Sequence, residues 1–391
     1  MQAVAEAKLL LTRYLPGELV EGSDYELLPD VYLGRADLRS ALTDFARLAV
    51  QQFRQNPALE SAFLHDYGGD PREAASHTEG VDLGVHLPLM EFGGEGQSLA
   101  RLQATVDAAR EGGFAAVSAN DHFVFSAPWL DGPTALAAVL ERSGELTLAT
   151  TISLVTLRGP VPLAKTLVAL DVLSGGRLIA GVGPGSSRSD YDAVGVPFED
   201  RWSRFEEAVT ILRALLGRAP APEQARFYPL PDGELLPSPV RDGGVPVWIG
   251  SWGSAAGLRR VARLADGWLA SAYNTTPEQF AAARERLAGE LDRQGRPADA
   301  FPNALVTMWT YVTEDRGERE RVLRHVLAPL LNREPDELRD RVCVGPAGHC
   351  ADLLSRYAAS GCQRVDIWPV GESARQTEHF ATHVAPHINR G

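Results

Sequence analysis

Several features that mark specialised protein classes are scarce or missing in this sequence. There are three cysteines in 391 residues (Cys343, Cys350 and Cys362) and no C-x-x-C pair, so neither a disulfide framework nor a thiolate zinc site is indicated. The apolar runs are shorter than a membrane-spanning helix, and the N-terminus has no basic flank of a secretory signal. These absences predict a cytoplasmic protein with free, buried thiols.

Positive charge is also scarce. Lysine and arginine together number 38 against 51 acidic residues, and only Lys8 and Lys165 are lysines, which leaves a net charge of −13. Without a basic cluster, neither nucleic acid nor an anionic membrane is expected as a partner. The hydrophobic fraction of 45% and the charged fraction of 23% are typical of a globular protein that builds its core without a metal.

From Val81 onward, short apolar segments alternate with longer amphipathic ones. The expected strands are 83–88, 115–119, 146–155, 177–182, 246–250, 267–271, 304–312 and 364–368. The expected helices are 98–111, 133–142, 161–173, 200–216, 254–265, 277–293, 317–332 and 346–360. Strands that are apolar throughout are typical of a parallel sheet covered on both faces. Eight such units predict an α/β fold, a (β/α)₈ TIM barrel in residues 81–391, and an open doubly wound sheet is the alternative.

Two regions lie outside this alternation. Residues 1–80 form a separate unit, expected to be mostly helical, that carries 13 acidic and 7 basic residues and so nearly half of the net charge. Residues 218–239 contain six prolines, so a Pro-rich insertion over 218–244 is expected between the fourth helix and the fifth strand.

Candidate functional residues follow the ends of the expected strands, where barrel enzymes carry their active sites. His86 ends the first strand, and Asp121 and His122 follow the second. An imidazole there is suited to acid–base work or to donating to a bound ring, although a lone loop histidine is also a common structural hydrogen-bonding group. No metal site is expected, because these histidines lack further ligands at suitable spacing.

Two glycine- and serine-rich loops, 183–187 and 250–254, follow the fourth and fifth strands. Glycines allow close backbone approach and a helix N-terminus favours an anion, so together the loops indicate a phosphate site. The alternative is that the glycines make tight turns and the serines cap helices. The segment 181–185 is not a dinucleotide fingerprint, because Pro184 removes a needed N–H and the loop follows the wrong strand.

Four segments, 109–123, 128–139, 157–208 and 245–269, resemble the bacterial luciferase-like superfamily of flavin- and F420-dependent oxidoreductases. The resemblance extends from about Val81 to the C-terminus. It implies a barrel that holds FMN or coenzyme F420 at the C-terminal ends of its strands. It further implies a non-proline cis bond behind the cofactor ring, at Thr150–Thr151 or Thr151–Ile152.

The same resemblance suggests which residues serve the cofactor. The catalytic candidates are His122, placed near the reactive ring, and Asp121 beside it. The cofactor-binding candidates are His86, Thr150, Thr151, Ile152, Gly183, Gly185, Ser186, Ser187, Gly250, Ser251, Gly253 and Ser254. The sequence departs from many relatives at Gly159, where they have histidine, and from some F420 enzymes at Ser186, where they have glutamate.

The expected function is therefore that of an oxidoreductase or monooxygenase acting on a small, uncharged or apolar organic substrate that binds over the ring. FMN supports oxygen activation or reduction and F420 supports hydride transfer, and the sequence leaves the choice open. NAD(P)H or a flavin reductase is the expected source of electrons, and a homodimer is a family expectation. The alternative is a non-catalytic flavin-binding or carrier protein with residues 1–80 as an interaction module.

Overall fold

The computed structural model describes residues 81–389 apart from 93, 95 and 231–232. These residues belong to one compact unit, Glu79–Gly391. The helical extension expected over residues 1–80 lies outside the described residues.

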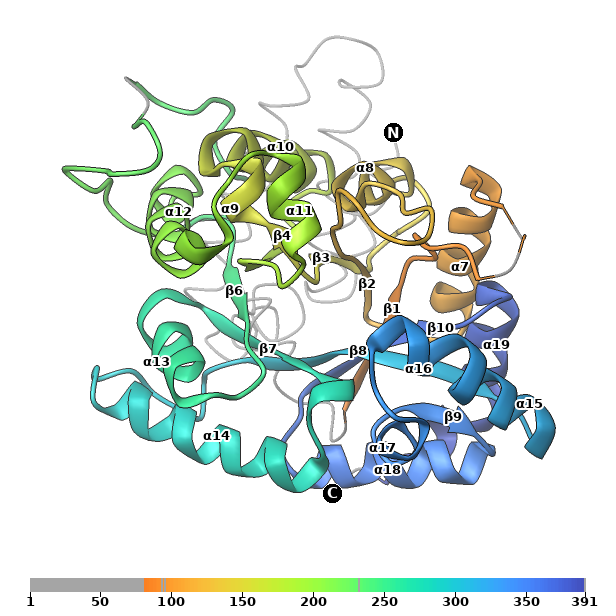
Figure 1. Cartoon of the computed structure of the whole chain (residues 1–391). Coiled ribbons are helices and arrows are strands. Elements are labelled where there is room, and N and C mark those ends of the chain that lie inside the picture. Colours follow the sequence, from red (N-terminus) through yellow and green to blue (C-terminus); the bar gives the residue numbers. More distant parts are fainter. Residues whose placement is uncertain (1–80, 93, 95, 231–232, 390–391) are drawn as a thin grey trace, which may run out of the picture. The chain divides into compact units, whose positions relative to one another are not determined.

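Eight parallel strands form a closed ring (Figure 1). They are β1 (Asp82–His86), β2 (Ala116–Ala119), β3 (Thr147–Thr150), β5 (Leu178–Gly183), β6 (Val247–Gly250), β7 (Gly267–Ser271), β8 (Asn303–Val312) and β10 (Arg364–Pro369). Each strand pairs with the next in this order, and β10 pairs with both β8 and β1, which closes the ring. The predicted (β/α)₈ barrel is confirmed, and the open doubly wound sheet was the wrong alternative.

The major helices follow the strands and cover the outside of the barrel (Figure 1). They are α7 (Leu99–Glu111), α8 (Gly132–Ala138), α10 (Pro160–Leu173), α12 (Arg201–Leu215), α13 (Ala255–Leu264), α14 (Pro277–Asp292), α18 (Ala347–Ala359) and α19 (Ser373–His383). Local chemistry fixes several starts: the side chains of Ser98, Asp131, Ser254 and Thr276 each accept a hydrogen bond from a backbone N–H of the first turn. None of the helices in the described part of the chain combines the length and hydropathy needed to cross a membrane.

The prediction of one continuous strand over 146–155 was wrong. A non-proline cis bond at Thr151–Ile152, the second of the two expected positions, separates β3 from the two-residue β4 (Ser153–Leu154). The short helix α9 (Val155–Arg158) follows at once. The chain therefore turns at the mouth of the barrel where apolar composition alone predicted an extended strand.

Other differences lie in the connections. A short strand β9 (Cys343–Gly345) pairs in parallel with the last three residues of β8, and α11 (Arg188–Ala193) and η2 (Phe198–Asp200) follow β5. The expected helix 317–332 is divided into α15 (Arg316–Arg321), the π-helix η4 (Val322–Leu327) and α16 (Ala328–Leu331), and α17 (Pro335–Leu338) lies beyond it. Two 3₁₀ turns complete the described elements, η3 (Ala272–Asn274) and η5 (Ala385–His387).

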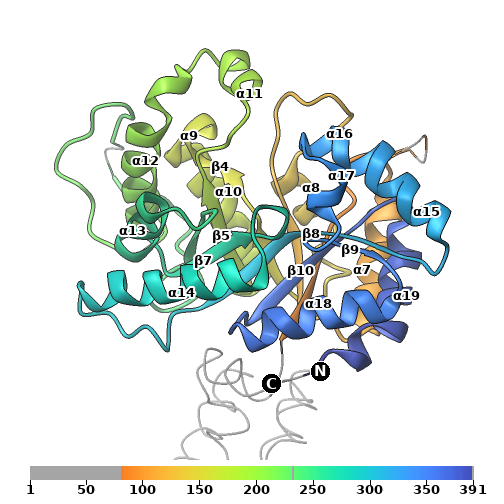
Figure 2. The same cartoon turned by 60° about the horizontal axis from the view of Figure 1, so that its bottom comes forward.

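The Pro-rich insertion leaves α12 and returns to β6 without helix or strand in its described residues, as a long loop beside α12 (Figures 1 and 2). It is tethered along its length. The Glu207 carboxylate accepts three consecutive backbone N–H groups, including that of Tyr228, whose hydroxyl donates to the Thr156 carbonyl at 2.7 Å. The insertion thus reaches α9, beside the C-terminal ends of the strands.

The main core lies between the strands and the helices, and a smaller cluster that includes Trp248, Leu269 and Val306 fills the barrel interior. The three cysteines are buried and unpaired, which confirms the predicted free thiols. Burial raises the pKa of Cys362 to about 12, so this thiol stays protonated and inert.

Candidate functional site

The predicted residues of the first two strands, of the cis-bond segment and of both glycine loops all lie at the C-terminal ends of barrel strands. His86 ends β1 and pairs in register with Ser118 of β2. Asp121 and His122 open the loop from β2 to α8. Parallel strands bring these ends to one face of the barrel, which is why residues distant in sequence meet there.

His122 forms a hydrogen bond with a carboxylate, and sequence reasoning missed this contact. Its Nδ1 lies 2.9 Å from Oδ2 of Asp190, a residue of α11. The other carboxylate oxygen of Asp190 accepts the backbone N–H groups of Phe123 and Val124, both at 2.8 Å. One buried carboxylate therefore fixes both the imidazole and the backbone that follows it.

A local signal for this residue exists in the sequence. Ser187 caps α11 by accepting from the backbone N–H of Asp190 at 3.4 Å. Serine followed three residues later by an acidic residue is a common sign of a helix start. That pattern predicts a short helix after β5, although it does not reveal which loop the Asp190 carboxylate contacts.

Asp190 is ionised in this arrangement. Burial by itself raises the pKa of its carboxyl, but the hydrogen bonds from His122, Val124 and Phe123 outweigh burial and hold the pKa below its usual value. A buried carboxylate facing Nδ1 selects the tautomer with the proton on Nδ1. Nε2 of His122 has no partner among the described residues, and the side chain is 21% exposed.

Aromatic rings surround His122 on its other sides. Phe125 and Trp129 lie 4.8 Å and 4.7 Å from the imidazole centroid. Trp129 in turn makes an edge contact with Trp368, which stacks on His86 at 3.6 Å. The imidazole therefore has a fixed position, an apolar wall and one free nitrogen.

The carboxylate of Asp121, the other catalytic candidate, is held in hydrogen bonds within the protein. It receives two hydrogen bonds from Arg158 of α9, at 2.5 and 2.6 Å, and one from the Leu154 backbone N–H at 3.2 Å. Arg158 also pairs with Asp131, at the start of α8. Burial lowers the pKa of Arg158, but its bonds to both carboxylates raise it by more. This geometry makes Asp121 an anchor of the loop.

Both ring nitrogens of His86 are likewise hydrogen-bonded, in this case to backbone groups. Nδ1 donates to the Leu87 carbonyl at 2.7 Å, and Nε2 accepts from the Asn120 N–H at 3.0 Å. Burial lowers the pKa of His86 to about 3, so the ring is neutral. Neither nitrogen is available to a ligand, and any contribution of His86 to cofactor binding is through the position of Asn120 and of the stacked Trp368.

The two glycine loops enclose Ile152, the residue after the cis bond. A Cβ on Gly183 would lie 2.9 Å from an Ile152 methyl carbon, and one on Gly250 would lie 3.1 Å from another. The Ser187 and Ser254 hydroxyls cap α11 and α13, as in the alternative interpretation of these loops.

The remaining loop positions have local reasons for their residue type. The Ser251 hydroxyl accepts the Gly253 N–H at 3.3 Å. Gly185 and Gly253 have φ of +81° and +85°, which glycine adopts without strain. The Ser186 hydroxyl is exposed.

The residues beside His122 fit the cofactor expected from the sequence. Polar side-chain atoms of Ser118, Asn120, Thr151 and Ser153 are buried without a hydrogen-bond partner among the described residues. All four lie at the ends of β2, β3 and β4, around the cis bond. Buried polar atoms are normally satisfied, so this edge is suited to a ring system that carries both carbonyl and N–H groups, as FMN and F420 do.

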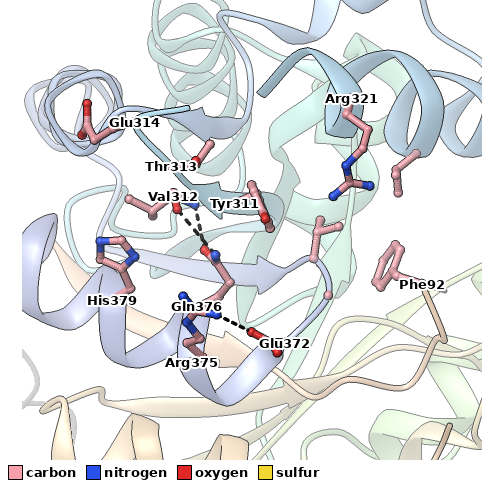
Figure 3. A pocket seen from close by; sticks show the side chains of 13 residues that line it. Phe92, Tyr311, Val312, Thr313, Glu314, Arg321, Glu372, Arg375, Gln376 and His379 are labelled. Carbon is pink, nitrogen blue, oxygen red and sulfur yellow. Dashed lines mark hydrogen bonds and ion pairs between the residues drawn. The ribbon is translucent and has the colours of Figure 1, made fainter. Parts of the chain in front are cut away.

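A separate cavity of about 440 Å³ lies between the ends of β8 and β10, α19 and Phe92 (Figure 3). In Figure 3 the Gln376 amide of α19 meets the Val312 backbone, whose N–H it accepts at 2.8 Å. None of the predicted catalytic or cofactor-binding residues lines this cavity. Among the described residues, no group of three or more His, Cys, Asp or Glu is placed to hold a metal ion.

Comparison with known proteins agrees with this architecture. The solved structure of the monooxygenase RslO1 from Streptomyces bottropensis superposes with a TM-score of 0.68 at 20% identity, over 79% of this chain and 100% of that one. A 5,10-methylenetetrahydromethanopterin reductase of Archaeoglobus fulgidus is 27% identical over 182 residues, which are 46% of this chain and 52% of the reductase. The chain spans about half the length of several curated relatives that it matches.

A longer match is found with the F420-dependent glucose-6-phosphate dehydrogenase of Intrasporangium calvum. It is 30% identical over 309 residues, which are 70% of this chain and 90% of that enzyme. Residues 77–342 match the family described as luciferase-like monooxygenase. With the closed barrel and the cis bond after β3, these matches show that the chain belongs to the luciferase-like monooxygenase family.

Proposed function

We propose that this protein is an oxidoreductase that binds FMN or F420 at the C-terminal face of its barrel and acts on a small organic substrate. The observation that carries the proposal is the His122–Asp190 pair, which presents a free imidazole nitrogen beside buried, unpartnered polar atoms. The 30% identity to an F420-dependent dehydrogenase supports F420 as the first cofactor to test. When bound, either cofactor supplies the hydride chemistry that protein side chains lack.

His122 holds or moves the proton in this proposal. Because Asp190 keeps the Nδ1 proton in place, Nε2 of His122 accepts a proton from the substrate or, once protonated, returns it. Asp190 also stabilises the imidazolium that forms, as a buried carboxylate does beside any histidine base. Asp190 is therefore a positioning residue, and His122 is the catalytic candidate.

Other predicted residues hold the cofactor. Asn120, Thr151 and Ser153 supply polar atoms for the ring edge, and Ile152, held between Gly183 and Gly250, supplies an apolar surface behind it. Loops 183–187 and 250–254 remain the proposed site for the cofactor phosphate or tail. Asp121, through Arg158, keeps the His122 loop in register with the cis-bond segment.

The experiment is an anaerobic titration of the full-length protein with FMN and F420 in parallel, read by the absorbance and fluorescence of the cofactor. Saturable binding of either supports the proposal, and binding of neither refutes it. His122→Gln is expected to change the absorbance of the bound ring and to abolish its reoxidation by substrate. His383→Gln, at an exposed position of α19, is the control and should behave as wild type. Reoxidation that is unaffected by His122→Gln would reject His122 as the catalytic residue, and cofactor binding without reoxidation in wild type would favour the carrier alternative.

The proposal includes two further expectations from the sequence. Electrons come from NAD(P)H or a flavin reductase, which is tested by mixing the protein with each donor. The protein is a homodimer, which is tested by light scattering. We also propose that residues 1–80 form a unit distinct from the barrel, whose deletion changes the oligomeric mass or the Michaelis constant. No change in either would contradict that role.

A further inference from the structure

A polar cluster at the end of β7 and in the middle of β8, where Ser271 pairs with Val306, contains none of the residues considered so far. The hydroxyls of Ser271 and Thr307 lie 2.9 Å apart, and the Asn274 amide donates to Ser271 at 3.0 Å. The Asn274 carbonyl oxygen in turn accepts from the Arg333 guanidinium at 2.9 Å. The four side chains form one connected chain that ends in a positive charge.

Thr307 occupies a backbone conformation that threonine rarely adopts. Its φ is +60°, and it sits where β8 carries an irregularity in its pairing with β10. A β-branched residue at positive φ is a true outlier, and bulges at barrel rims serve to redirect a side chain. Residues on either side fit this interpretation: Leu305 and Met308 belong to the outer core, and Val306 belongs to the barrel interior. The bulge thus brings the Thr307 hydroxyl to Ser271.

Arg333 has no carboxylate within ion-pair distance among the described residues. Its described hydrogen bonds go to Asn274 and to the Asn332 carbonyl. A second guanidinium, that of Arg341, donates to the Tyr273 carbonyl on the same turn and likewise has no acidic partner in the described part of the chain. Guanidinium groups without a carboxylate are suited to bidentate binding of an oxyanion.

The cluster lies across the barrel mouth from His122. β2 is second and β7 is sixth in the closed ring of eight strands, so their ends are diametrically opposed. The loops from these strands also share a hydrophobic cluster, since Trp129 and Tyr273 both pack against it. A ligand that reaches from one side of the mouth to the other would meet the imidazole at one end and Arg333 at the other.

We propose that Ser271, Asn274, Thr307 and Arg333 bind an oxyanion, a carboxylate or a phosphate, carried by the substrate at the end remote from the reacting atoms. This inference rests on the proposed function and refines it, and it replaces the uncharged or apolar substrate expected from the sequence with one that carries an anion at its remote end. The hydroxyls and the Asn274 amide orient the anion, and Arg333 supplies the charge.

The test is calorimetric titration of the full-length protein with acetate, benzoate and inorganic phosphate, and with benzamide as the neutral counterpart of benzoate. At least one anion is expected to bind wild type ten-fold or more tightly than benzamide binds. Arg333→Gln should abolish this preference. Asn274→Asp, which places a carboxylate beside the guanidinium with little change in shape, should abolish it as well. Arg316→Gln removes the same charge from an exposed position of α15 and should have no effect.

Two outcomes overturn the inference. One is the absence of any preference for an anion in wild type, or a preference that survives Arg333→Gln with circular dichroism unchanged. The other is an Arg333→Gln variant that loses FMN or F420 affinity ten-fold while anion binding persists, because the cluster would then serve the cofactor. Failure of wild type to bind either cofactor refutes the proposed function alone, since the anion titrations need no cofactor.

Discussion

The two sides of the barrel mouth differ in how their charged side chains are paired. On the β2 side, each carboxylate near His122 has a cationic or backbone partner: Asp121 and Asp131 share Arg158, and Asp190 holds His122. On the β7 side, Arg333 is bound only by neutral groups among the described residues. A neutralised network fixes positions, whereas an uncompensated charge is available to a ligand.

The two sides also differ in backbone conformation and in the hydrogen bonds that fix their loops. The β2 side is built from well-formed hydrogen bonds to a loop backbone, and those bonds replace the regular pairing that a loop lacks. The β7 side contains Thr307 in an unfavourable conformation. Such strain persists only where the surrounding structure enforces it, and it is typical of functional positions. Variants on the two sides of the mouth test this difference.

The largest effect is expected from Arg158→Met. It leaves the carboxylate of Asp121, whose side chain is fully buried, without its partner, and breaking a buried pair costs about 3–5 kcal/mol. Chemical denaturation measures the loss. Arg142→Met breaks an exposed pair with Asp107 and should cost less than about 1 kcal/mol. Equal losses in the two variants would contradict a special role for the β2 network.

Asp190→Asn is expected to lower turnover about 10²-fold, the usual size of an acid–base contribution. The amide oxygen still accepts the Phe123 and Val124 N–H groups, but the amide nitrogen no longer selects the Nδ1 tautomer of His122. Stopped-flow reoxidation of the bound cofactor measures the rate. Asp192→Asn, on the exposed side of the same helix, controls for the lost charge, and an equal effect there would reject the positioning role.

Acid should destabilise the protein through His86. Its folded pKa of about 3 lies below the ordinary value of 6.5, so between these values the unfolded chain binds the extra proton and stability falls as pH falls. The slope is about 1.4 kcal/mol per pH unit. His86→Gln keeps one donor and one acceptor without titrating, and should reduce the slope of unfolding free energy against pH by that amount. An unchanged slope would show that His86 does not titrate as described.

The smallest effect is expected from Thr307→Gly on the β7 side. Glycine adopts φ of +60° freely, so relief of strain offsets its greater unfolded-state entropy, and stability should be unchanged or rise by about 1 kcal/mol. Anion binding should weaken at the same time. Thr147→Gly in β3, where no such strain exists, should instead lose about 1 kcal/mol. A loss of stability in Thr307→Gly would remove the argument that strain at this position serves binding.

The sequence predicted the parts of this fold that depend on local periodicity. Alternating strands and helices predicted the barrel, and the expected helices 254–265 and 277–293 begin at side chains, Ser254 and Thr276, that cap them. The segment 146–155 was misjudged, because a cis bond and a sharp turn leave apolar composition unchanged. The same limit applies to the division of 317–332 into α-helical and π-helical parts.

For the site, the sequence by itself determined that His122 follows a strand and that two glycine loops follow two others. The family resemblance added the two possible places for the cis bond. Only the tertiary structure decided that Asp190 holds His122, that Arg158 occupies Asp121, and that Arg333 lies beside Asn274 without a carboxylate among the described residues. These pairings join residues from 37 to 68 positions apart. The closure of the barrel sets such contacts, and the pattern of residue types along the chain carries no record of them.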